Sequence, residues 1–125
     1  MYEYAAQLAK VVDGDTVDVI TDLGFHIHIT QRIRLLGINC PEHGTPAGDN
    51  ATAYTAAWIA QHGPALLLRT QLDRTEKYGR ILGSIYASGR SLNEDLVTDG
   101  HAVAYDGGRR TLPRQGQPDP TEPVL

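Results

Sequence analysis

The strongest constraint on the fold is the alternation of apolar and polar residues in two neighbouring segments. "TVDVIT" at 16–21 and "FHIHITQRIRLL" at 25–36 follow a two-residue period, which is the period of a strand with one buried face. The second segment places three large apolar residues on that face: Phe25, Ile27 and Ile29. "DLG" at 22–24 predicts the hairpin loop between the two strands.

A third strand and a helix flank this strand pair. The strand is predicted over 4–12, ahead of the pair, so that the three strands form a strongly curled sheet. The loop 37–50 is rich in glycine and proline and ends in two helix-capping residues, Asp49 and Asn50. Alanines then recur at helical spacing until Gly63-Pro64, which ends the helix.

Two further strands and a second helix complete the order. Segments 65–73 and 80–87 are the predicted strands, joined by a polar turn. Ser91 and Glu94 form a capping box that begins the helix, and Gly100 ends it. Three strands, a helix, two strands and a helix are the order of a five-stranded Greek-key barrel of the OB type, an α+β fold.

The chain is expected to form one domain followed by a tail. Segment 101–105 gives a last short extended piece. From residue 106 onward the sequence has four prolines and little to bury, which favours an extended tail. We therefore expect a domain over 1–105 and a tail over 106–125. OB barrels commonly bind oligonucleotides, but a fold alone does not establish an activity.

Composition excludes several classes of protein. The 41% hydrophobic and 21% charged content are those of a globular domain, and no apolar run approaches a membrane span. No secretory signal opens the chain, so a cytoplasmic location is expected. The single cysteine, Cys40, rules out an internal disulfide and a cysteine-rich zinc finger. A net charge of -4 gives no global attraction to a polyanion, which must be held by local charge.

Three short stretches gather polar residues at predicted strand ends and turns. They are "DGDT" at 13–16, "RLLGINCPE" at 34–42 and "KYGR" at 77–80. A hard cation such as calcium takes oxygen ligands, and phosphate takes forked arginine donors. A metal, a water and two arginines around one phosphate make a phosphodiesterase site. The residues that offer these groups are Asp13, Asp15, Glu42, Asn39, Arg34 and Arg80.

These motifs resemble those of the thermonuclease family, the staphylococcal nuclease-like domains. The resemblance covers 11–105 and includes "VVDGDTV", "RIRLLGINCPE", "EKYGRILGSIY" and "SLNEDLVTDGHA". It implies a calcium-dependent nuclease that cuts the 5'-oxygen to phosphorus bond of DNA or RNA. Nucleic acid is then the substrate, no membrane is involved, and we expect a monomer.

The resemblance also implies a metal site. Asp15 would be a calcium ligand, with Asp13 close to the metal but not bound to it. Asn39 stands at the family's second carboxylate position, and the backbone carbonyl of Cys40 would complete the protein ligands. Glu42 would hold or deprotonate the attacking water.

Phosphate contacts follow from the same resemblance. Arg34 and Arg80 would bind the scissile phosphate and stabilise the five-coordinate transition state. Lys77 and Tyr78 match positions that contact a neighbouring phosphate. Tyr105 matches a nucleotide-contacting tyrosine across a one-residue gap.

Two departures from the family pattern affect these expectations. Asn39 replaces an aspartate, so one negative charge is lost and weaker calcium binding, or a different divalent metal, is expected. The family's third, basic C-terminal helix has no equivalent after Tyr105. Three arginines beyond that point would still supply some phosphate affinity: Arg109, Arg110 and Arg114.

Other interpretations of the same residues remain open. Asn39 and the missing helix are consistent with an OB-fold module that binds nucleic acid without cutting it. Cys40 with His43 suggests a cysteine nucleophile. His26 and His28, together with Cys40 or His43, suggest a zinc site. A scaffold domain that docks through its tail is a further alternative.

Overall fold

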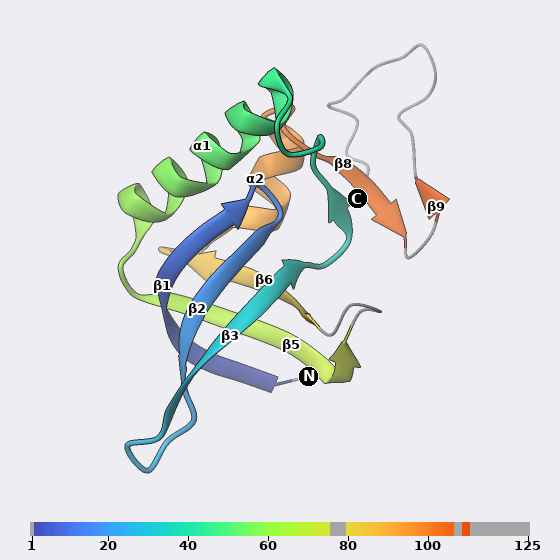
Figure 1. The fold of residues 1–125 in the computed structure, drawn as a ribbon. Coiled ribbons are helices and arrows are strands. Elements are labelled where there is room, and N and C mark those ends of the chain that lie inside the picture. Colours follow the sequence, from blue (N-terminus) through green and yellow to red (C-terminus); the bar gives the residue numbers. More distant parts are fainter. Residues whose placement is uncertain (1, 76–79, 107–108, 111–125) are drawn as a thin grey trace.

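The chain folds into a closed five-stranded mixed β-barrel with two helices (Figure 1). The computed structural model describes residues 2–75, 80–106 and 109–110. The predicted α+β barrel of the OB type is confirmed. The strands are β1 (Tyr2–Asp13), β2 (Thr16–Asp22), β3 (His28–Leu35), β4 (Ile38–Asn39), β5 (Leu66–Thr75), β6 (Ile81–Ala87), β7 (Arg90–Ser91), β8 (Val103–Asp106) and β9 (Arg109–Arg110), and the helices are α1 (Pro46–His62) and α2 (Leu92–Thr98).

A parallel pairing closes the barrel. The main sheet has the order β3-β2-β1-β5-β6-β7, in which neighbouring strands are antiparallel. β3 then pairs in parallel with β6, from Ile33 opposite Ile81 to Leu35 opposite Gly83. The alternating side chains of the strands fill the interior, as the two-residue period predicts. The largest fully buried apolar residues of the strands are Val17, Val19, Ile33, Leu35, Leu68 and Ile85.

Helix α1 begins earlier than the sequence pattern indicated. Its N-cap is Thr45, whose hydroxyl accepts a hydrogen bond from the backbone N–H of Gly48 at 3.0 Å. Pro46 occupies the first turn, where its missing N–H costs nothing. The prediction of Asp49 and Asn50 as caps is therefore wrong, because both lie inside the helix.

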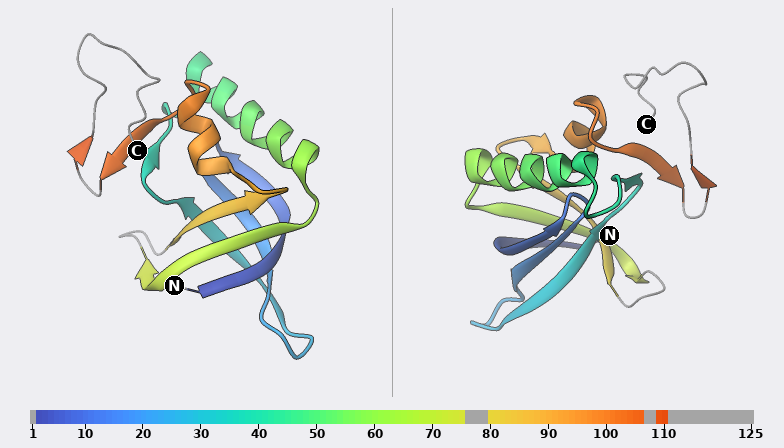
Figure 2. Two further views of the ribbon diagram at one scale, coloured as in Figure 1. Left: turned by 180° about the vertical axis from the view of Figure 1, so that it is seen from behind. Right: turned by 45° about the horizontal axis from the view of Figure 1, so that its top comes forward.

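Helix α2 begins as predicted and packs beside α1 (Figure 2). The Ser91 hydroxyl accepts from the N–H of Glu94 at 3.1 Å, and Gly100, with φ +83°, follows the last turn. Asp95 joins the two helices, since its carboxylate accepts from Trp58 Nε1 at 2.8 Å and from Arg90 Nε at 2.9 Å.

The hairpin between β2 and β3 is longer than expected. The Asp22 carboxylate accepts from the N–H of Gly24, and φ is positive at Gly24, Phe25 and His26. The loop therefore runs to Ile27, and β3 begins at His28. Phe25, Ile27 and Ile29, all predicted on the buried face, are instead 93%, 51% and 41% exposed.

The C-terminal part is described only in its first segments. The extended piece predicted at 101–105 is confirmed as β8, which pairs with β4 on one side and with β9 on the other. Strand β9 lies within the predicted tail, and residues 111–125 lie outside the described residues, so the boundary at 105 stays a prediction. The described part of the chain contains no helix long and apolar enough to cross a membrane.

Candidate active site

The chain after β3 folds back around the Arg34 side chain. One terminal nitrogen, Nη1, donates to the carbonyls of Leu35 at 2.9 Å and Ile38 at 3.0 Å. The other, Nη2, donates to Oδ1 of Asn39 at 3.0 Å. Only 13% of the Arg34 side chain is exposed. These bonds fix the orientation of the guanidinium, which in turn holds the turn that carries Asn39.

The Asp15 carboxylate lies against the turn of residues 35–40 around Arg34, which we call the Arg34 corner. Its Oδ2 accepts from the backbone N–H of Cys40 at 2.9 Å and lies 3.5 Å from Arg34 Nη2. Its Oδ1 accepts from the hydroxyl of Thr16 at 3.2 Å. Asp15 is 9% exposed, and a buried carboxylate needs such partners. The structure thus brings together four predicted site residues: Asp15, Arg34, Asn39 and Cys40.

Helix α1 holds the turn that carries Asp15. The Thr55 hydroxyl donates to the carbonyl of Gly14 at 2.7 Å. A Cβ on Gly14 would lie 2.7 Å from Cβ of Ala51 and 3.0 Å from Sγ of Cys40. Glycine is required there because helix and turn approach too closely for a side chain. The "DGD" motif is therefore a contact between the sheet and α1 as well as a turn.

Asp13 and Glu42 lie farther out. Asp13 pairs with Nδ1 of His43 at 3.0 Å, and 33% of its side chain is exposed. Glu42 is exposed, and its carboxylate has no hydrogen-bond partner among the described residues. The backbone of Glu42 is nevertheless anchored, since its carbonyl accepts from the Thr45 hydroxyl at 2.7 Å and lies against Gly48.

The remaining predicted residues are only partly described. Arg80 is half-buried, engaged in an interaction of its own, and directly precedes Ile81, which pairs with β3. Tyr105 lies in β8, next to the strand that carries Asn39, but its side chain lies outside the described part of the structure. Lys77 and Tyr78 fall outside the described residues altogether.

Asn93, a residue of α2 that was not predicted as part of the site, holds the Arg34 corner through hydrogen bonds to the backbone. Its Oδ1 accepts from the N–H of Ile85 at 3.2 Å, and its Nδ2 donates to the carbonyls of Leu36 at 2.9 Å and Gly83 at 3.4 Å. It is 6% exposed. The sequence contains one signal for this role. Asn93 lies four residues before Val97, so it falls on the buried side of the helix, where a polar side chain needs hydrogen-bond partners.

The oxygen atoms at this corner fit a hard divalent cation. Oδ2 of Asp15 and Oδ1 of Asn39 lie 3.5 and 3.0 Å from the same nitrogen, Nη2 of Arg34, so the two oxygens share one cationic neighbour. Only one of these oxygens carries charge. The described residues hold no group of three or more His, Cys, Asp or Glu side chains that could share a metal. Oxygen donors of this kind suit a hard cation better than zinc, which prefers nitrogen and sulfur ligands.

The described residues likewise contain no histidine zinc site. His26 and His28 belong to the β2–β3 hairpin and the start of β3, whereas Cys40 directly follows β4. The hairpin lies at the opposite end of β3 from β4 (Figure 1). His28 has an acidic neighbour, Asp22, at 4.0 Å. The zinc interpretation is therefore wrong for the residues that the structure describes.

The Cys40 thiol is not poised for attack. It belongs to the buried core, and burial, together with the charge of Asp15, raises its pKa to about 12. A thiol with this pKa stays protonated at neutral pH, and the thiolate is the reactive form. The cysteine-nucleophile interpretation is not compatible with this environment.

We expect Cys40 in the folded protein to resist iodoacetamide at pH 8, because the thiol is both buried and protonated. The protein unfolded in urea should be alkylated completely, which serves as the control. Mass spectrometry of the two samples makes the comparison. Rapid modification of the folded protein would contradict the described burial of Cys40.

Comparisons with known proteins place this geometry in context. The chain matches the family model described as "Staphylococcal nuclease homologue" over residues 32–117, a range that contains Arg34, Asn39 and Glu42 but begins after Asp15. An "Uncharacterized endonuclease" of Escherichia coli is 32% identical over 120 residues, covering 95% of this chain and 67% of the relative. A "Micrococcal nuclease" of Shigella flexneri is 31% identical over 116 residues, covering 82% and 59%.

In a third relative, the match covers a smaller share of the relative's own length. "Endonuclease YncB" of Bacillus subtilis is 31% identical over 105 residues, which cover 78% of this chain and 47% of the relative. The chain thus spans between about half and two thirds of the length of these relatives.

Proposed function

The chain belongs to the family of staphylococcal nuclease homologues, and from this premise we propose that it is a nuclease that hydrolyses phosphodiester bonds of DNA or RNA with calcium as its metal. The observation that carries the proposal is the fixed Arg34 guanidinium beside the oxygens of Asp15 and Asn39. An arginine next to hard oxygen donors is the arrangement that phosphate and a divalent cation require together.

Arg34 and Arg80 would receive the charge that develops on phosphate. The carbonyls of Leu35 and Ile38 hold Arg34 before substrate binds, so little reorganisation is needed when charge develops. Arg80, directly before β6, would supply the second guanidinium. The two arginines face three carboxylates, those of Asp13, Asp15 and Glu42, so phosphate binding would depend on the positions of the guanidinium groups and on a bound cation rather than on a net positive charge.

The metal and water sites would lie on the Asp15 side of the corner. Asp15, Asn39 and the carbonyl of Cys40 would hold calcium, with Asp13 just outside. Bound there, the ion would stabilise charge on phosphate and make a bound water more acidic. Glu42, whose exposed carboxylate is not used in the described fold, would accept the proton of the attacking water.

Contacts to the rest of the nucleic-acid strand would come from neighbouring segments of the protein chain. Lys77 and Tyr78 are proposed to contact an adjacent phosphate, and Tyr105 a nucleotide. Tyr105 belongs to β8, which pairs directly with the strand of Asn39. Alanine at any of these positions should weaken substrate binding more than the chemical step.

The proposal is tested by incubating a labelled single-stranded DNA with the protein in millimolar calcium, with a chelator as the control. Cleavage that requires the metal is the expected result. DNA that stays intact but is retained by the protein would overturn the proposal in favour of a binding module. In that case Asn39 would mark a site that holds phosphate without the metal affinity needed to cut it.

Asn39→Asp should lower the calcium concentration that gives half-maximal activity. The aspartate would keep the acceptor for Arg34 Nη2 and add one negative charge to the metal site. Calcium titration of cleavage by the two proteins measures the effect. An unchanged or higher requirement would mean that Asn39 is not a metal ligand.

A further inference from the structure

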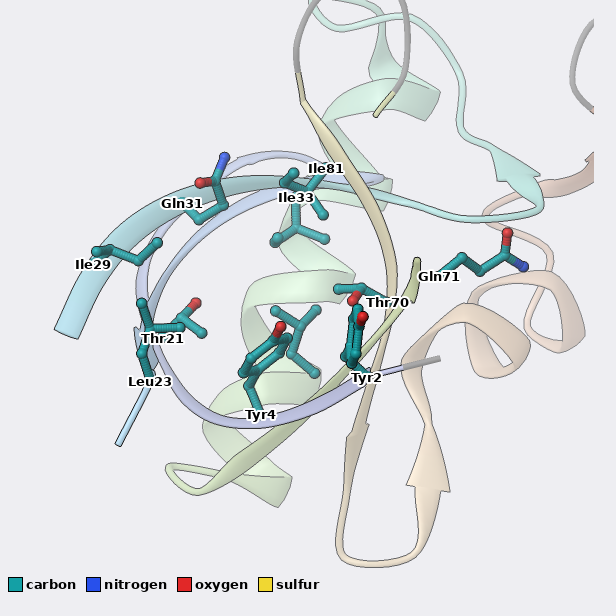
Figure 3. A pocket seen from close by; sticks show the side chains of 11 residues that line it. Tyr2, Tyr4, Thr21, Leu23, Ile29, Gln31, Ile33, Thr70, Gln71 and Ile81 are labelled. Carbon is teal, nitrogen blue, oxygen red and sulfur yellow. The ribbon is translucent and has the colours of Figure 1, made fainter. Parts of the chain in front are cut away.

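The barrel contains a cavity at the end opposite α1, which we call the mouth cavity. It has a volume of about 330 Å³ and is lined by side chains from β1, β2, β3, β5 and β6 and from the first residue of the hairpin loop (Figure 3). Apolar side chains of Ile33, Leu68 and Ile81 contribute to its wall. The volume lies at the small end of the range of ligand pockets.

A buried hydroxyl in this cavity lacks a partner. Thr21 is 3% exposed, and its Oγ1 makes no hydrogen bond within the described part of the chain. Figure 3 shows the hydroxyl pointing into the cavity. An unpaired buried hydroxyl is costly, and native proteins almost always satisfy such a group. The hydroxyl lies in the cavity wall with almost no exposed surface, so a polar ligand atom in the mouth cavity could pair with it after a small shift of the neighbouring side chains.

Other uncharged polar groups surround Thr21. Tyr2, Tyr4, Thr70 and Gln31 line the same cavity, and their hydroxyls and amide can both donate and accept. The rings of Tyr2 and Tyr4 lie 6.4 Å apart on one side of β1. No described lining residue carries a charge at pH 7. A phosphate or another ion would find no counter-charge there.

We propose that the mouth cavity binds one uncharged nucleobase, either as a free nucleoside or projecting from a nucleic-acid strand. A base matches the cavity because it has a planar face for tyrosine and an edge of donors and acceptors. A hydrocarbon of similar size would leave the Thr21 hydroxyl unpaired. Binding of a strand in this way rests on the proposed function, whereas binding of a nucleoside does not.

The test is a titration of ¹⁵N-labelled protein with adenosine and, separately, with thymidine, in the presence of a chelator. Amide signals of Thr21, Ile33 and Thr70 are expected to shift with at least one nucleoside. Thr21→Val removes the hydroxyl at nearly constant shape and should weaken that binding about tenfold. The valine variant should remain folded, because it removes an unpaired polar atom. Thr30→Val, on the outer face of β3, is the matched control.

Each outcome decides the question. Absence of shifts at these amides with either nucleoside in millimolar excess would overturn the proposal, as would equal affinities of the wild type and Thr21→Val. A further titration with a single-stranded oligonucleotide, again in the presence of a chelator, shows whether the bound base comes from a free nucleoside or from a nucleic-acid strand. Shifts at the mouth cavity would indicate a base on a strand, and shifts with nucleosides alone would indicate a free nucleoside. DNA cleavage is measured separately, so loss of the base site leaves the nuclease proposal intact.

Discussion

Arg34→Ala should lower the rate of DNA cleavage by about a thousandfold or more, a loss typical of a guanidinium that stabilises a phosphoryl transition state. The fixed position of Arg34 makes the effect large, because its guanidinium is held between Asp15 and Asn39 before substrate binds. Single-turnover cleavage at saturating calcium measures the chemical step. Arg80→Ala should produce a loss of similar size.

Arg32→Ala is the matched control for this prediction. Arg32 lies two residues earlier on the same face of β3, but it is exposed and pairs with Asp18 through two hydrogen bonds of 2.7 and 3.0 Å. An exposed pair contributes little to stability, so cleavage by this variant should stay near the wild-type rate. Equal losses in the two variants would show that general positive charge, and not the fixed Arg34, is responsible.

Asn93→Ala should lower the free energy of unfolding by about 2–4 kcal/mol, since three backbone groups lose a buried partner. The groups are the N–H of Ile85 and the carbonyls of Leu36 and Gly83. Urea unfolding monitored by circular dichroism gives the value. The variant should also cleave DNA more slowly under conditions where it is folded, because Leu36 belongs to the turn around Arg34.

Asn50→Ala is the corresponding control, because Asn50 is an exposed residue of α1. Its stability should differ little from that of the wild type. If Asn93→Ala unfolded at the same urea concentration as Asn50→Ala, the described hydrogen bonds of Asn93 would contribute nothing measurable. α2 would then have no measurable role in supporting the Arg34 corner.

Local patterns predicted those parts of the structure that local physics determines. The alternation in β2 and in the second half of β3 and the Ser91 cap of α2 depend on residues close together in the sequence, and these predictions are confirmed. The first half of β3 does not follow the prediction, since Ile29 is 41% exposed. The start of α1 was missed because Asp49 and Thr45 are both suitable caps, and Pro46 decides between them. The end of the hairpin loop was predicted too early because φ is positive at three consecutive residues, and only one of them, Gly24, is a glycine that indicates this in the sequence.

The site required tertiary information that no short pattern contains. The motifs predicted that Asp15, Arg34 and Asn39 belong together, and the structure places them within hydrogen-bond or ion-pair distance. Asn93 and Thr55 were missed because their partners are backbone groups of segments far away in the sequence. The mouth cavity was also missed, since it depends on the combined size of side chains from five strands.

The parallel pairing that closes the barrel has a consequence for folding. It joins residues 33–35 to residues 81–83, so it forms only after a long loop of chain has been ordered. Arg34 lies in this seam, between Ile33 and Leu35. A nascent or partly unfolded chain therefore has the arginine but not the corner that orients it. Cleavage would begin only when the barrel has closed, which ties the onset of the proposed activity to the folding of the domain.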